Sequence, residues 1–201
     1  MERPNYFNPA NLLTYTRILS VPFLVWIMTW LDDTRRVHVT ANMVSSIVAT
    51  VVFTFAGFSD LLDGWIARKY GTVSTYGKFI DPLADKILLL GVTVMMVPIG
   101  RLPAWLVVVI LAREITITTL RAIAAAEGII IAASQWGKRK AAFQSVALGA
   151  LLLHYPFLKI NFHLIGWIVL WISVVFSLGS AGHYTYCFFR EAMDKGRAPS
   201  N

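Results

Sequence analysis

Six long apolar stretches constrain the fold of this chain more than any other feature. A helix that crosses a bilayer needs about 20 predominantly apolar residues. With 57% of its residues hydrophobic and 14% charged, the chain is far more apolar than a soluble domain. We therefore expect an all-α integral membrane protein with six transmembrane helices, at about residues 12–31, 41–58, 82–99, 103–120, 141–158 and 163–180.

The six stretches use most of the chain, so we expect one membrane domain over residues 1–201. Residues 1–11 are then a short interfacial segment, and residues from about 190 to 201 form a tail. The first stretch has no clear small-residue cleavage site after it, which favours a retained helix over a signal peptide. Cys187 is the single cysteine, so no disulfide forms within the chain.

The positions of the basic residues predict the orientation in the membrane. The net charge of +7 would suit nucleic acid, but basic residues of membrane proteins usually serve orientation and anionic head groups. With a cytoplasmic N-terminus, the Lys and Arg residues lie on or near the inner side except Arg35, Arg36, Arg101 and Lys159. The positive-inside rule then places both termini in the cytoplasm. We expect a bacterial-type inner membrane protein with no nucleic-acid partner.

Four aspartates form two helically spaced pairs. Three lie between the second and third stretches, and the fourth lies at the start of the third. Asp60 and Asp63 are three residues apart and Asp81 and Asp85 are four apart, so each pair lies on one face of its helix. Four carboxylates gathered near a membrane repel one another unless cations neutralise them. Such oxygen ligands favour Mg²⁺ or Mn²⁺, and two ions clamp the oxygens of a phosphoryl transfer. The plainer interpretation is that Asp81 caps a helix, that Asp60 and Asp63 are solvated surface acids, and that Asp85 pairs with Lys86 or Arg68.

The same segment predicts where two helices begin and end. Residues 60–69 keep a helical spacing, so we expect the second helix to continue past the bilayer core. Residues 71–75 have the composition of a loop. Asp81 followed by Pro82 is typical of a helix start, because proline favours the first helical position. The third helix is therefore predicted to begin inside this motif.

The spacing of these residues resembles the signature of the CDP-alcohol phosphatidyltransferase family at every fixed position. The pattern is Asp60-x-x-Asp63-Gly64-x-x-Ala67-Arg68, eight residues, then Gly77-x-x-x-Asp81-x-x-x-Asp85. The resemblance implies six helices and a homodimer, and the predicted orientation places the active site on the cytoplasmic side. It also implies that Asp60 and Asp81 bridge two metal ions, that Asp63 and Asp85 complete one ion each, and that Asp85 is the general base.

The other motif residues suit binding of a CDP-linked lipid. Gly64 and Gly77 let a nucleotide or a neighbouring helix approach the backbone, and Ala67 keeps the same face shallow. Arg68 can bind a phosphate oxygen through its guanidinium fork. Ser74 is carried over from the resemblance as a further nucleotide contact.

Two more segments resemble the phosphatidylglycerophosphate synthases of this family. The first, Asn11-x-x-Thr14-x-x-Arg17, is expected near the head group of the activated lipid; its alternative is a helix cap with an inner-face arginine. The second runs from Arg113-Glu114 through Arg121 and Gly128 to Gly137-Lys138-Arg139-Lys140-x-x-x-Gln144. Ala141 departs from the pattern, since many members have threonine there.

A phosphate-bearing acceptor needs compensating cations when it is partly desolvated, and Arg113, Arg121 and Lys138 are the candidates. Alternatively these cations enforce topology or bind anionic lipid, the role expected for Arg139 and Lys140. The implied reaction transfers the phosphatidyl group of CDP-diacylglycerol to glycerol 3-phosphate and releases CMP. Inositol phosphate, serine or phosphatidylglycerol are alternative acceptors. An ion transporter is the non-enzymatic alternative, but the sequence shows no paired inverted halves.

Overall fold

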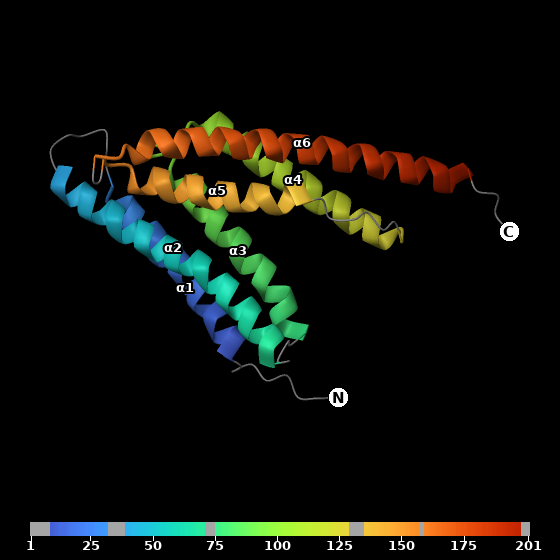
Figure 1. The fold of residues 1–201 in the computed structure, drawn as a ribbon, viewed down its shortest axis with the longest axis horizontal. Helices are drawn as coiled ribbons and strands as arrows, with labels where there is room; N and C mark the ends of the chain where they lie inside the picture. Colours follow the sequence, from blue (N-terminus) through green and yellow to red (C-terminus); the bar gives the residue numbers. More distant parts are fainter. Residues whose placement is uncertain (1–8, 32–38, 71–74, 129–134, 157–158, 198–201) are drawn as a thin grey trace.

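The computed structural model describes six helices (Figure 1). They are α1 (Pro9–Thr29), α2 (Val39–Tyr70), α3 (Thr75–Met95), α4 (Ala104–Ala126), α5 (Gln135–Leu153) and α6 (Phe162–Arg197). The backbone is described for residues 9–31, 39–70, 75–128, 135–156 and 159–197, and the side chains for 14–31, 39–59, 80–128, 140–156 and 159–193. The expected all-α fold is confirmed for this part of the chain.

The helices form two groups that meet at one end and diverge toward the other (Figure 1). Helix α1 packs along α2 and α3, whereas α5 packs along α6 and α4 contacts α6. The main link between the groups is the contact of α2 with α5, and α3 makes only limited contact with α4 and α5. The site described below lies between the two groups.

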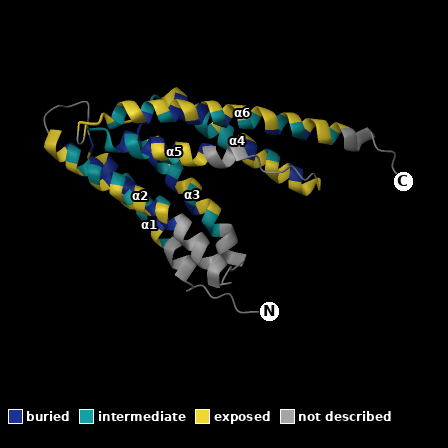
Figure 2. Ribbon diagram, in the orientation of Figure 1, coloured by how far each residue is buried: buried dark blue, intermediate teal, exposed yellow. Residues whose placement is uncertain are grey.

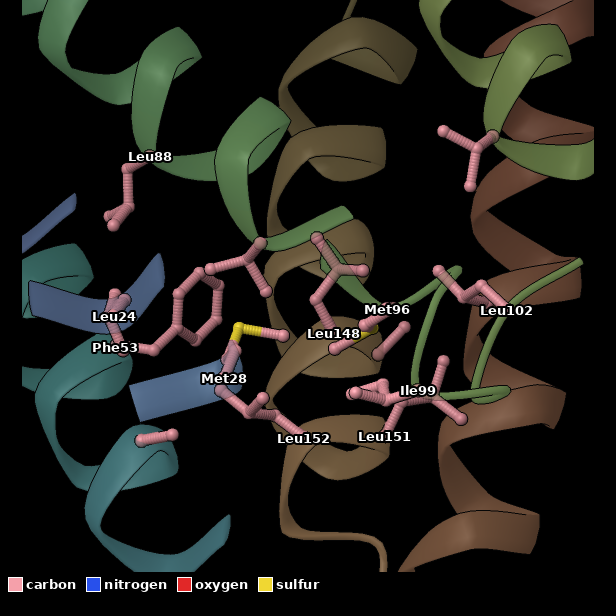
Figure 3. Close-up of a cluster of buried hydrophobic side chains, with 14 of the residues drawn as sticks. Leu24, Met28, Phe53, Leu88, Met96, Ile99, Leu102, Leu148, Leu151 and Leu152 are labelled. Carbon is pink, nitrogen blue, oxygen red and sulfur yellow. The ribbon is translucent and has the colours of Figure 1, made fainter. Parts of the chain in front are cut away.

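Buried apolar side chains from both groups join them into one core (Figure 3). Leu24 and Met28 of α1 and Phe53 of α2 lie beside Leu148 and Leu152 of α5. Each of these five residues is at most 4% exposed. The continuous cluster fixes how α1–α3 sit against α5 and so fixes the position of the aspartate-bearing helices.

A buried arginine supports the turn between α3 and α4. Gly100 adopts a φ of 76°, which glycine accepts without a steric penalty. The next residue, Arg101, is 1% exposed. Its guanidinium donates to Ser46 Oγ of α2 at 2.7 Å and to the carbonyl oxygen of Leu152 at the end of α5. These bonds satisfy a polar group that would be costly to bury alone.

Many large apolar side chains are exposed, and Figure 2 shows exposed positions along the helices. Trp30, Leu19, Phe55 and Val175 are between 68% and 71% exposed, which suits contact with lipid. By length and composition, the described side chains include two stretches able to cross a bilayer, Val39–Ser59 and Phe162–Met193. An all-helical membrane protein is therefore supported, and the full set of six spans stays a prediction.

The predicted start of the third helix is wrong. Helix α3 begins at Thr75, and Pro82 lies inside it. A proline in a helix interior removes one backbone hydrogen bond and costs about 3 kcal/mol, which is why the sequence suggested a start at that point. The seven residues before Pro82, from Thr75 to Asp81, are nevertheless helical. Asp81 is therefore an interior residue of α3 and not a helix cap.

Other boundaries differ less. Helix α2 extends to Tyr70, as the helical spacing of residues 60–69 predicted. Helix α5 ends at Leu153, five residues before the predicted end of that span. Helix α6 continues as far as Arg197, through most of the expected tail. Of the predicted loop at 71–75, Thr75 is already helical and the rest lies outside the described residues.

Candidate active site

Asp81 and Asp85 stand one turn apart on α3, and both side chains are half-buried. This is the arrangement that their spacing predicted. Asp60 and Asp63 lie on the last turns of α2, but their side chains are outside the described set. Among the side chains that are described, no group of three metal-ligating residues forms. The structure thus documents the α3 half of the predicted carboxylate site.

Asp81 is held by a residue of the first helix. The hydroxyl of Thr14 on α1 donates to Asp81 Oδ1 at 2.6 Å, across 67 residues of sequence. Thr14 is 1% exposed and Asp81 is half-buried, so this hydrogen bond is partly shielded from water, which strengthens it. A segment that the sequence associated with the lipid head group therefore touches a predicted metal ligand directly.

Arg17 lies one turn further along α1 and reaches α2. It is fully buried, and its Nε donates to the carbonyl oxygen of Ala56 at 3.2 Å. Ser59 Oγ donates to the same oxygen at 2.7 Å. Ala56 precedes Asp60 by one helical turn. One face of α1 therefore contacts both helices that carry the aspartates.

A cavity of about 360 Å³ opens between α3, α4 and α5 beside Asp85. Near Asp85 its wall includes charged side chains, namely Lys86, Glu114 and Lys140. Further along α3 and α4 the wall becomes apolar, with Leu89, Leu90, Ile110 and Leu111. The cavity thus offers charged groups at one end and an apolar surface at the other, as a lipid-linked phosphate requires.

Glu114 is the centre of the charged wall. Its Oε2 accepts a hydrogen bond from Arg113 at 3.1 Å and another from the ammonium of Lys140. The Lys140 side chain is 8% exposed and the Glu114 side chain 37%. A largely buried ammonium is tolerable only when it is paired. The sequence suggested that Lys140 contacts anionic lipid at the surface. Instead, its side chain is buried and lines the cavity.

The two predicted acceptor arginines, Arg113 and Arg121, lie outside the cavity. Arg113 directs its Nε to the carbonyl oxygen of Ser177 on α6 at 3.1 Å. Arg121 is exposed, and its guanidinium lies over the ring of Tyr184, 5.6 Å from the centroid. Neither arginine belongs to the cavity lining. Their contacts hold α4 against α6.

Lys86, which the sequence offered as a partner for Asp85, instead spans the cavity. Its Nζ donates to Thr118 Oγ1 of α4 at 2.9 Å. This bond ties α3 to α4 where the two helices make limited contact.

Several predicted site residues have side chains outside the described set, so their placement stays a prediction: Asn11, Gly64, Ala67, Arg68, Ser74, Gly77 and Lys138. Two residues that sequence reasoning did not assign to the site are Lys86 and Lys140. Both are charged residues within or beside an apolar stretch, which is costly and usually functional, and Lys140 also belongs to the second segment of the resemblance.

Comparison with known proteins agrees with the motif. The family described as CDP-alcohol phosphatidyltransferase matches residues 7–179. The chain is 37% identical over 181 residues to the CDP-diacylglycerol–glycerol-3-phosphate 3-phosphatidyltransferase of Bacillus subtilis strain 168, which covers 89% of this chain and 93% of the relative. It is 34% identical over 197 residues to the protein of the same name in Mycoplasma pneumoniae, covering 90% and 87%. The chain belongs to the CDP-alcohol phosphatidyltransferase family.

Proposed function

We propose that this protein transfers the phosphatidyl group of CDP-diacylglycerol to sn-glycerol 3-phosphate, giving phosphatidylglycerophosphate and CMP. The observation that carries the proposal is the 37% identity to a relative named for this reaction, over 93% of that relative's length. The site supports it, because two carboxylates and two cations line a cavity that becomes apolar toward its far end.

In the proposed reaction, Asp85 accepts the proton of the primary hydroxyl of glycerol 3-phosphate. The resulting oxygen attacks the phosphorus that carries diacylglycerol, a new P–O bond forms, and the P–O bond to CMP breaks. Asp85 suits this role because it lines the cavity, where a hydroxyl can come within hydrogen-bonding reach of it. Binding donor and acceptor side by side removes most of the entropic cost of their encounter.

Two divalent cations, Mg²⁺ or Mn²⁺, are proposed to bind Asp60, Asp63, Asp81 and Asp85. The α3 pair fits such ions, because its two carboxylates share one helix face and Asp81 is held by a hydroxyl. When bound, the ions would neutralise charge on the pyrophosphate. Arg68, Gly64, Gly77 and the remaining motif residues are proposed to bind the CDP group.

The phosphate of the acceptor is proposed to bind the cations contributed by α4 and α5. Arg113, Arg121 and Lys138 are carried forward from the sequence, although neither arginine lines the cavity, and Lys140 joins them. Lys140 has the most direct support, since its side chain lines the cavity that Asp85 also lines. Arg113 would act on the phosphate indirectly, because it and Lys140 both form an ion pair with Glu114.

The proposed setting is the bacterial cytoplasmic membrane, with six spans, both termini and the active site on the inner side, and a homodimer as the functional unit. The excess of Lys and Arg on one side supports this orientation. Exposed apolar side chains on the outer faces of the helices agree with a lipid environment.

The test is an assay of the purified full chain in detergent with CDP-diacylglycerol and glycerol 3-phosphate. We expect phosphatidylglycerophosphate and CMP in equal amounts, with activity lost in EDTA and restored by Mg²⁺ or Mn²⁺. Release of CMP without a matching amount of phosphatidylglycerophosphate would contradict the proposed acceptor. Undiminished activity in EDTA would contradict the metal site.

A further inference from the structure

We propose that Thr14 is a positioning residue for the metal site, and that it acts by fixing the rotation of the Asp81 carboxylate. The inference rests on the proposed two-ion site but goes beyond it, because it assigns a function to α1, which carries none of the four aspartates. The sequence alone suggested a different role for Thr14, contact with the head group of the donor lipid.

The geometry of the contact supports a positioning role. Thr14 Oγ1 donates to Asp81 Oδ1 at 2.6 Å, a length typical of a hydroxyl bonded to a carboxylate. A carboxylate turns easily about its last torsion. A hydrogen bond to Oδ1 fixes that rotation and therefore fixes the direction in which Oδ2 points. Hydrogen bonds of this kind to a metal ligand tune its affinity for the ion.

The surroundings make the contact rigid. Thr14 is 1% exposed, and threonine has few side-chain rotamers because it is β-branched. One turn later on the same face of α1, Arg17 is buried and bonded to the carbonyl oxygen of Ala56 on α2. Helix α1 is thus bonded to α3 at Asp81 and to α2 one turn before Asp60. It can hold the two aspartate-bearing helices at a fixed separation.

The experiment measures Mn²⁺ binding without substrates, from the loss of the free-ion electron paramagnetic resonance signal in detergent-purified protein. Thr14→Val keeps the shape of the side chain and removes the hydroxyl. We expect it to weaken Mn²⁺ binding about ten- to a hundredfold, the usual range for a lost hydrogen bond to a metal ligand. Thr14→Ser restores the donor and should recover affinity to within about threefold of wild type.

A matched control is available on the same helix. Thr29 Oγ1 bonds to the carbonyl oxygen of Trp26 within α1, so Thr29→Val removes a hydroxyl without touching an aspartate and should leave Mn²⁺ affinity unchanged.

Combining Thr14→Val with Asp81→Asn completes a double-mutant cycle. Once the carboxylate has become an amide, loss of the hydroxyl should cause little further weakening. If Thr14→Val does not fold, Thr14→Ala replaces it.

Three results would overturn the inference: wild-type Mn²⁺ affinity in a folded Thr14→Val protein, an equal loss in the Asp81→Asn background, or a rise in KM for CDP-diacylglycerol with unchanged kcat. The last result would return Thr14 to the lipid head group. Failure of the proposed reaction can be distinguished from failure of the positioning role. If wild type makes no phosphatidylglycerophosphate but the Mn²⁺ pattern holds, the reaction is wrong and the positioning role stands.

Discussion

The carboxylate side and the basic side of the candidate site are built in different ways. On α3, Asp81 and Asp85 are one turn apart, and their relation follows from the helix alone. On α4 and α5, Glu114 and Lys140 come from different helices and meet only through tertiary packing. Helical spacing is therefore enough to group Asp81 with Asp85, whereas grouping Glu114 with Lys140 requires the fold.

The two sides are also tied to the rest of the protein by different hydrogen bonds. Asp81 is bonded to α1, and α1 is bonded to α2 through Arg17. Across the cavity, Lys86 bonds to Thr118 of α4, where α3 and α4 otherwise make limited contact. The described hydrogen bonds therefore tie the carboxylate side to α1 and α2, and they bridge the cavity through Lys86 and Thr118.

The largest effect is expected on the carboxylate side. Asp81→Asn keeps the size of the side chain but removes the charge of a proposed bridging ligand, so turnover should fall by at least about a thousandfold. The measurement is kcat under saturating CDP-diacylglycerol and glycerol 3-phosphate, with thermal unfolding showing that the variant is folded. Near wild-type turnover in a folded variant would rule out the two-ion interpretation.

Asp85→Asn tests whether Asp85 is chiefly a base. Loss of a general base should lower kcat by about a hundred- to ten-thousandfold, while binding of CDP-diacylglycerol survives through the other three aspartates. Kinetics and equilibrium binding of the donor must be measured on the same preparation. If donor binding is lost but turnover per bound complex is unchanged, Asp85 is a ligand and the base is another group.

On the basic side, Lys140→Met removes the ammonium and keeps the length of the side chain. A charge-assisted contact contributes roughly 1.5–3 kcal/mol, so KM for glycerol 3-phosphate should rise about ten- to a hundredfold. KM for CDP-diacylglycerol should stay within about threefold.

Arg121→Ala is the companion variant, because Arg121 is exposed and lies over Tyr184. Its effect on the acceptor KM should be smaller than that of Lys140→Met. An equal or larger effect would place the phosphate at the end of α4, and equal losses for both substrates would mean that these cations chiefly hold the helices together.

The smallest effect concerns stability, at the contact of α5 with α6. A Cβ added at Gly166 would lie 2.7 Å from Leu151 Cγ and 2.9 Å from the Leu151 backbone nitrogen. Gly166→Ala should therefore lower the free energy of unfolding by about 1–3 kcal/mol. Gly179→Ala is the control, since its added Cβ meets nothing within 4 Å. Equal unfolding midpoints would show that α5 and α6 pack less closely than described.

The limits of prediction from sequence follow the same division. Spacing along one helix grouped Asp81 with Asp85, and the motif predicted the family. Pro82 led to a wrong prediction of where α3 begins. The preference of proline for helix starts is a local propensity, and the helix begins at Thr75 despite it. The Thr14–Asp81 bond joins residues 67 positions apart, and no local signal indicates such a contact. Lys140 looked like a surface cation because its partner, Glu114, is on another helix.

The central claim, transfer to glycerol 3-phosphate, is tested most directly by competition. Purified protein with Mg²⁺ and labelled CDP-diacylglycerol receives glycerol 3-phosphate, inositol phosphate, serine and phosphatidylglycerol at equal concentrations in one reaction, and mass spectrometry identifies the lipid products. Phosphatidylglycerophosphate should be the dominant product, and Lys140→Met should reduce it without reducing donor binding. A dominant product carrying any of the other three acceptors would contradict the claim.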